Sequence, residues 1–263
     1  TLELQEEIVN MRIGSNMLSI PMDDYEEVSK DQDLLRKKLN NLRQSALQPL
    51  GQLHVKEFPS STMSTNDLRT YLVKAQEILG YKFENVFVDY INIMKNWRNP
   101  NTENLYMKIK QISEDLRAVA QEEQWCIITP TQTNRGGWDN SDLTISNVSE
   151  SAALLHTVDG LFGIITSPEM KARGEYYLKY LADRVSGLEN TRKRFDFIRQ
   201  YVRIEEDMNA QIEDMDSVIM GAGSWKEKKL ANANSNNSQS QIAITVSNEP
   251  NITGMGLFAE DSK

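Results

Sequence analysis

The 263-residue chain has almost none of the residues that form disulfides or bind structural metals: one cysteine and two histidines. A single Cys126 excludes an internal disulfide, and without further cysteines a zinc cluster cannot form. His54 and His156 are far apart and have no Cys or His neighbours. Each is therefore expected to have a core or surface role rather than to bind a metal.

Long apolar runs and targeting segments are also missing. No run approaches the roughly 18 apolar residues that a membrane span requires, and no signal peptide opens the sequence. These absences predict an intracellular, cytoplasmic protein with no membrane partner.

The chain has fewer positive than negative residues: 29 Lys and Arg and 38 Asp and Glu, which give a net charge of -9. This balance excludes a protein that coats nucleic acid through bulk charge, because phosphate neutralisation needs clustered cations. A narrow basic lining remains compatible with it. One dense basic stretch also carries aromatics, "RKRFDFIRQYVR" at 192–203, and either a nucleic-acid lining or the solvated face of a strand pair would account for it.

What is present is an alternation of helical and strand patterns, which predicts an α/β fold with a mostly parallel sheet flanked by helices. A capping box at Ser64 and Asp67 begins one helix, and Gly80 ends it. The last pattern, at 194–206, predicts a β-hairpin. The expected helices cover 3–18, 31–47, 65–80 and 103–123, and the expected strands 52–58, 84–89, 125–132, 160–166 and 176–184.

The composition divides the chain into three parts. A folded domain is expected over 1–207, a helical extension over 208–230, and a disordered polar tail over 231–263, where "ANANSNNSQSQ" is nearly free of apolar residues. The chain starts at Thr1 without a methionine and enters a helical pattern at once. The N-terminal part of the domain is therefore expected to lie upstream of this sequence.

Polar residues end two of the expected buried strands. Asp89 follows "VFV" and Gln132 follows "WCIITPT". In a parallel sheet the carboxyl ends of strands lie together, and chemistry collects there. Asp89 could bind magnesium through water or merely cap a turn. Gln132 could contact a terminal phosphate.

Two further charged residues are candidates for catalysis. Glu3, beside a bound nucleotide, could polarise water as a general base, or it could simply favour the positive end of a helix dipole. Arg184 ends the pattern "YLADR", where a guanidinium could reach a phosphate across a subunit boundary. A surface salt bridge is the alternative for Arg184.

No Gly-Lys pair occurs, so the chain has no phosphate-binding P-loop. Five segments nevertheless follow one another in a familiar order: "TLEL", "VFVDYINIM", "ITPTQTNR", "SNVSESAALLHTVDGLFGI" and "YLADRVSG". In this order they resemble the RecA-like motor domain of DnaB-family replicative helicases, most of all the T-even bacteriophage branch. The resemblance covers residues 1–207.

The resemblance implies an ATP-driven 5'–3' helicase whose P-loop precedes Thr1, with ATP and Mg²⁺ as cofactors. It implies that Glu3 is the catalytic base, Asp89 the magnesium-site acid, Gln132 the phosphate sensor, and Arg184 a finger to the neighbouring subunit. It also implies a homo-hexameric ring on single-stranded DNA, a primase and a helicase loader as partners, and the host cell cytoplasm as location for a phage protein. The residues expected to contact DNA are Arg135, Gly136, Gly137, Ser149, Glu150, Ser151 and Ala152.

Three features depart from the family pattern. Ala182 stands where bacterial members have a Lys two residues before the finger. Ser149–Ala152 reads Ser-Glu-Ser-Ala where they read Arg-Glu-Ser-Gly, which removes a phosphate-pairing charge. Without a P-loop, this chain alone is expected to be inactive and not to bind ATP tightly.

Two other classes of protein remain as alternatives. A RecA-type recombinase ATPase shares the expected fold and chemistry but forms an open filament. A non-catalytic, ATPase-like binding module would lend a surface to a replication partner without hydrolysing ATP.

Overall fold

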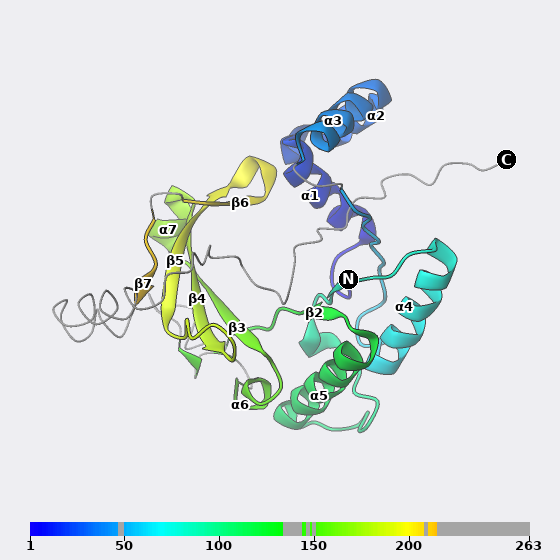
Figure 1. Ribbon diagram of the computed structural model, residues 1–263, viewed down its shortest axis with the longest axis vertical. Helices are drawn as coiled ribbons and strands as arrows, with labels where there is room; N and C mark the ends of the chain where they lie inside the picture. The colour runs from blue at the N-terminus through cyan, green and yellow to red at the C-terminus, as the bar shows by residue number, and fades with distance from the viewer. Residues whose placement is uncertain (47–49, 134–143, 146–147, 149–150, 208–209, 215–263) are drawn as a thin grey trace, which may run out of the picture.

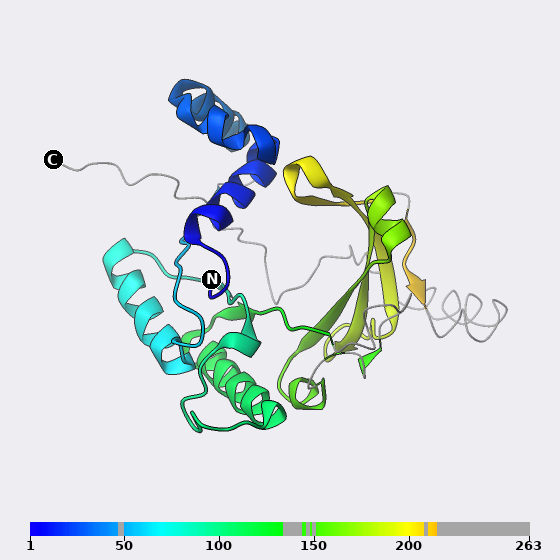
Figure 2. The same ribbon diagram turned by 180° about the vertical axis from the view of Figure 1, so that it is seen from behind.

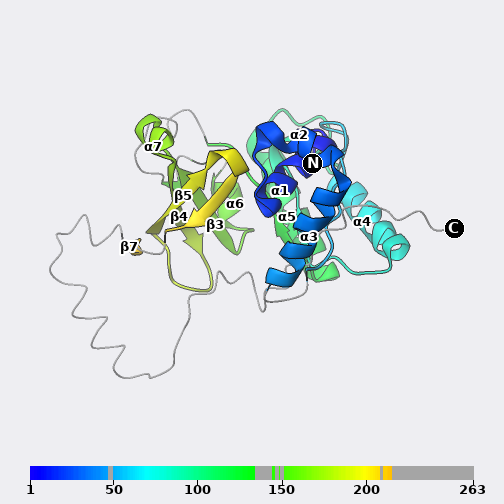
Figure 3. The same cartoon turned by 90° about the horizontal axis from the view of Figure 1, so that it is seen from above.

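The computed structural model describes residues 1–46, 50–133, 144–145, 148, 151–207 and 210–214. Its helices α1 to α5 and the strand β2 lie on one side, and an antiparallel sheet lies on the other (Figure 1). The view from above separates these two halves most clearly (Figure 3). The fold is mixed α/β, as the sequence predicted.

Three helices at the N-terminus pack against one another. They are α1 (Glu6–Leu18), α2 (Met22–Lys30) and α3 (Gln32–Ser45). Their shared core holds Leu18, Ile20, Tyr25 and Leu35. The sequence predicted helices corresponding to α1 and α3 but not α2, a short segment in which few residues are apolar.

The next two helices begin and end where the sequence indicated. In α4 (Thr65–Leu79), Ser64 and Asp67 form the predicted capping box, and Gly80 ends the helix with a φ of 74° that favours glycine. The two hydrogen bonds from Ser64 lower the pKa of Asp67. The longer helix α5 (Leu105–Glu123) is capped by Asn104.

A short parallel pair of strands flanks α5 in the chain. Strand β1 (Asn85–Phe87) pairs with β2 (Cys126–Ile128), with Val86 opposite Ile127. Helix α5 makes the crossover between them, which is the connection that parallel strands require. The main core packs α5 against this pair and includes Val86, Val88, Ile109, Ile112 and Leu116.

The larger sheet is antiparallel throughout its described strands. The prediction of a mostly parallel sheet is therefore wrong for the described part of the chain. The connection from β3 to β4 contains only the six-residue helix α7 (Pro168–Arg173), whereas a parallel crossover needs about a dozen residues or more. The strands are β3 (Gly160–Ile165), β4 (Glu175–Asp183), β5 (Thr191–Ile198), β6 (Arg203–Glu206) and β7 (Glu213–Asp214).

Other expectations have mixed outcomes. The hairpin predicted at 194–206 is confirmed as the β5–β6 pair. Residues 52–58 form no strand. Of the helical extension predicted at 208–230, the structure describes only 210–214, where β7 pairs with β5. The tail at 231–263 lies outside the described residues.

Helix α1 also contacts the β5–β6 hairpin. This contact joins the helical half to the antiparallel sheet. The Asn16 side chain donates to the carbonyl of Val202 at 3.0 Å, and the Arg203 guanidinium donates to Ser19 Oγ at 2.9 Å. The view from behind shows the turn between β5 and β6 lying next to α1 (Figure 2). Within the described residues, no helix has the length and apolar character needed to cross a membrane.

Candidate nucleotide site

The N-terminal turn lies against the end of the β1 strand segment. The Leu2 amide donates to the carbonyl of Asp89 at 2.8 Å, and the Leu2 side chain is buried in the main core. On the other side, the Thr1 amino group donates to the Lys56 carbonyl at 2.7 Å, and the Phe58 amide donates to the carbonyl of Thr1 at 3.0 Å. This double attachment places Glu3 directly after a residue that is bonded to Asp89.

Side-chain hydrogen bonds continue the contact between the two parallel strands beyond their backbone pairing. The last backbone bond runs from Val88 to the carbonyl of Ile128 at 2.9 Å. Beyond it, Gln132 Nε2 donates to the Tyr90 hydroxyl at 2.9 Å. The peptide bond between Asp89 and Tyr90 is cis. The structure thus brings Asp89, the Glu3 turn and Gln132 to one edge of the molecule.

A second pair of side chains reinforces that edge. Thr131 Oγ1 donates to Asn92 Oδ1 at 3.0 Å, and the Asn92 carbonyl accepts from Lys108 Nζ on α5 at 2.8 Å. Burial lowers the pKa of Lys108. The end of β2 and α5 therefore hold the short helical turn Ile91–Ile93, which follows β1, in place.

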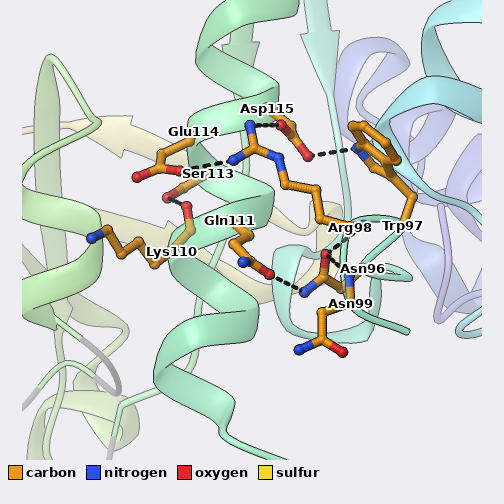
Figure 4. Close-up of polar contacts among 9 residues, drawn as sticks. All are labelled: Asn96, Trp97, Arg98, Asn99, Lys110, Gln111, Ser113, Glu114 and Asp115. Atoms are coloured by element: carbon orange, nitrogen blue, oxygen red, sulfur yellow. Dashed lines mark hydrogen bonds and ion pairs between the residues drawn. The ribbon is translucent and has the colours of Figure 1, made fainter. Parts of the chain in front are cut away.

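The segment after Asp89 is also fastened to α5 further along (Figure 4). The Trp97 indole donates to Asp115 Oδ2 at 2.7 Å, and the Arg98 guanidinium pairs with both Asp115 and Glu114. Asp115 is only 7% exposed, so these partners satisfy a carboxylate that would otherwise be buried without compensation. Because both ends of the loop are fixed, Asp89 has a rigid support.

The side chains at this edge suit a magnesium–phosphate ligand. Glu3 and Gln132 are exposed and Asp89 is half-buried, so each of the three residues is accessible to solvent. Over the described ranges, no cluster of three or more His, Cys, Asp or Glu residues could hold a metal ion by itself. Mg²⁺ is commonly bound by one or two carboxylates together with water and substrate phosphates. A single carboxylate at Asp89 fits that mode of binding.

Arg184 makes its contacts in a different part of the structure from Glu3, Asp89 and Gln132. Its guanidinium donates to the carbonyl of His156 at 2.8 Å and lies 3.6 Å from the carboxylate of Asp159. Its contacts are with α6 (Ser151–Leu155) and the residues that follow α6, and none involves Glu3, Asp89 or Gln132. The salt bridge that the sequence left as an alternative is therefore present.

Four of the five cations in the basic stretch at 192–203 form ion pairs. Arg192 pairs with Glu213, Lys193 with Glu206, and Arg203 with Glu205. Arg194 pairs with Asp207 and Glu175. Arg199, the fifth cation of the stretch, donates to the carbonyl of Lys171. The stretch therefore matches the solvated face of a strand pair, and nearby acids pair with four of its five cations.

The residues expected to contact DNA fall largely outside the described part of the chain. This applies to Arg135, Gly136, Gly137, Ser149 and Glu150. Ser151 and Ala152 are the first two residues of α6.

Sequence reasoning missed the residues that support the site. Tyr90 had a visible signal, since it directly follows Asp89 at the end of a buried strand. Asn92, Lys108 and Asp115 gave none, because their roles depend on how α5 packs against the loop.

The chain is similar to known helicases in sequence. The family model "DnaB-like helicase C terminal domain" matches residues 1–175. A DnaB-like replicative helicase of Enterobacteria phage T4 is 29% identical over 212 residues, which cover 79% of this chain and 44% of that protein. The chain thus spans less than half of this relative.

Two solved structures share the fold. One is described as "The Structure Of A DnaB-Like Replicative Helicase And Its Interactions With Primase" and has a TM-score of 0.61 at 16% identity, covering 78% of this chain and 48% of that chain. The other is described as an ATPase domain, has a TM-score of 0.62 at 16% identity, and covers 78% of this chain and 72% of that chain. At this identity the likeness concerns the fold alone.

Proposed function

This chain belongs to the DnaB-like helicase C-terminal domain family, and we propose that the protein containing it is an ATP-driven replicative DNA helicase. The observation that carries the proposal is the meeting of the Glu3 turn, Asp89 and Gln132 at one edge, held by the bonds Leu2–Asp89 and Tyr90–Gln132. Residues upstream of Thr1 would supply the phosphate-binding loop.

Each of the three residues has a distinct part in hydrolysis. Glu3 accepts a proton from water, whose oxygen attacks the terminal phosphorus of ATP as the bond to ADP breaks and ADP keeps the electron pair. Asp89 is the carboxylate that would hold Mg²⁺, and the ion, when bound, would neutralise charge on the phosphates. The Gln132 amide contacts the terminal phosphate and transmits its loss to the loop that follows.

The proposal includes an assembly of several copies on DNA. In the proposal, six copies form a ring around single-stranded DNA and move 5'–3' along it, and Arg184 reaches the nucleotide of the neighbouring copy. Residues 135–146 and 149–152 face the DNA, where backbone amides can contact phosphates without a large basic surface. A primase and a helicase loader are proposed partners. A primase is named in the description of one structure that shares the fold.

The test is DNA-stimulated ATP hydrolysis and strand separation by the protein that contains this chain. Asp89→Asn should lower both by roughly a hundredfold or more, while Glu84→Gln, an exposed carboxylate just before the same strand, should leave both unchanged. An unmutated protein that hydrolyses no ATP would favour a non-catalytic binding module. Helical filaments rather than closed rings in electron micrographs would favour a recombinase.

A further inference from the structure

We propose that Arg117 is a second phosphate-binding arginine, which acts together with Arg184 on the nucleotide held by a neighbouring copy. The inference rests on the proposed function and adds a residue that the motifs did not indicate. Arg117 lies on α5, far from Arg184 in sequence, so only the fold brings the two together.

The two guanidiniums meet at one carboxylate. Arg117 donates to Asp159 Oδ1 at 2.8 Å, and Arg184 lies 3.6 Å from the same oxygen. The main chain fixes this meeting point, because the Arg184 amide donates to the carbonyl of Asp159 at 3.0 Å. Asp159 is thus the shared counter-ion of the two guanidiniums.

Carbonyl groups at the end of α6 hold both guanidiniums in place. Arg184 donates to the carbonyls of Leu155 and His156, at 3.3 Å and 2.8 Å, and Arg117 donates to that of Thr157 at 2.6 Å. Each guanidinium has five N–H donors in a fixed planar fork. The remaining donors can therefore bind a further acceptor while these bonds persist.

The pair lies where an outside anion can reach it. The side chains of Arg117, Arg184 and Asp159 are 32%, 43% and 68% exposed. Asp159, the counter-ion, is the most exposed of the three, so an incoming phosphate can displace it. A terminal phosphate carries more negative charge than a carboxylate and can accept bonds from both forks at once.

Arg117 also accounts for a departure from the family pattern. Position 182 holds alanine, whose side chain packs against the main core, so β4 offers no second cation two residues before Arg184. Arg117 supplies a positive charge beside Arg184 from a different element. The neighbouring nucleotide would thus meet two cations, Arg184 from the residue after β4 and Arg117 from α5.

The first experiment measures the ATPase of the complete helicase subunit with DNA. Arg117→Ala should lower kcat by about tenfold to a hundredfold with little change in KM, and Arg117→Lys should recover part of the loss because it keeps the charge. The matched control is Arg69→Ala, since Arg69 joins α4 to α5 through Glu122 and Glu123 and is similarly exposed, at 44%. Equal kcat values for Arg117→Ala and the unmutated protein would overturn the assignment.

The second experiment separates action on a neighbour from a structural effect within one copy. Arg117→Ala subunits are co-assembled with Glu3→Gln subunits, which lack the base but keep both arginines. Mixed rings should hydrolyse ATP faster than the sum of the two variants alone, because an intact pair then faces an intact base. Arg184→Ala, mixed in the same way, serves as the reference.

The outcomes distinguish the proposed role of Arg117 from the proposed helicase function. Recovery with Arg184→Ala but not with Arg117→Ala would overturn the role of Arg117 and leave the helicase proposal intact. No recovery with either variant would reject an arginine site acting between copies. An unmutated protein without ATPase activity would reject the proposed function itself.

Discussion

The side-chain amide of Gln132 donates a 2.9 Å hydrogen bond to the hydroxyl of Tyr90, across the ends of two neighbouring strands. Tyr90 directly follows Asp89, so a single bond joins the proposed phosphate sensor to the proposed magnesium site. The nitrogen of Gln132 is held by Tyr90, and its second N–H is left for a phosphate oxygen.

Removing the Tyr90 hydroxyl should therefore slow hydrolysis without weakening ATP binding. Tyr90→Phe is expected to lower kcat roughly three- to tenfold, the range of one ordinary hydrogen bond, with KM nearly unchanged. Steady-state ATPase assays on the complete protein measure this directly. Tyr81→Phe, which removes a hydroxyl outside the site, is the control. A rise in KM with an unchanged kcat would contradict the positioning role of Tyr90.

The loop that supports Asp89 depends on the buried carboxylate of Asp115. Arg98→Ala removes the cation that pairs with this carboxylate and should destabilise the fold by about 1–3 kcal/mol. Chemical denaturation gives this value. Arg69→Ala should cost less than about 1 kcal/mol, because its acid partners are more exposed, at 54% and 21%. Equal losses in both variants would show that Asp115 gains no special stability from Arg98.

The turn at 183–188 should lose stability in acid. Partial burial alone would raise the pKa of Asp183, but hydrogen bonds from the Ser186 hydroxyl and from the amides of Val185, Ser186 and Leu188 outweigh it and lower the pKa from 3.8 to about 2. Because the folded-state pKa lies below the ordinary value, the stabilisation is complete above about pH 4. It is lost as the pH falls toward 2.

Thermal melts between pH 5 and pH 2 test this turn. The melting temperature of Asp183→Asn should fall less steeply over this range than that of the unmutated protein, because the variant has no carboxylate to protonate. Glu189→Gln, an exposed residue of the same turn, should follow the unmutated curve. Identical slopes for all three proteins would show that the Asp183 hydrogen bonds do not stabilise the fold.

Local signals allowed much of the fold to be predicted. The capping box at Ser64, the stop at Gly80 and the apolar face of α5 each act within a few residues, so the sequence displays them. The strand patterns do not indicate the antiparallel direction of the β3–β4 pair, because that direction depends on the length of the connection between the strands. The short helix α7 leaves too little chain for a parallel crossover.

The candidate site likewise contains residues that the sequence indicates and residues that only the fold reveals. Asp89 and Gln132 were visible because each ends an apolar strand pattern, and their common edge follows from parallel pairing. Arg117 was not visible, since its meeting with Arg184 depends on how α5 packs beside the end of α6. The DNA-contact residues at 135–137 remain a prediction that rests on the resemblance.

The most direct measurement of the central claim is single-turnover ATP hydrolysis by the complete protein carrying Glu3→Gln, with ATP binding followed in parallel. If the Glu3 turn, Asp89 and Gln132 surround one triphosphate, binding should be unchanged and hydrolysis should slow by about a hundredfold or more. Glu7→Gln, an exposed glutamate of α1, should behave as unmutated. Hydrolysis by Glu3→Gln at the unmutated rate would contradict the account.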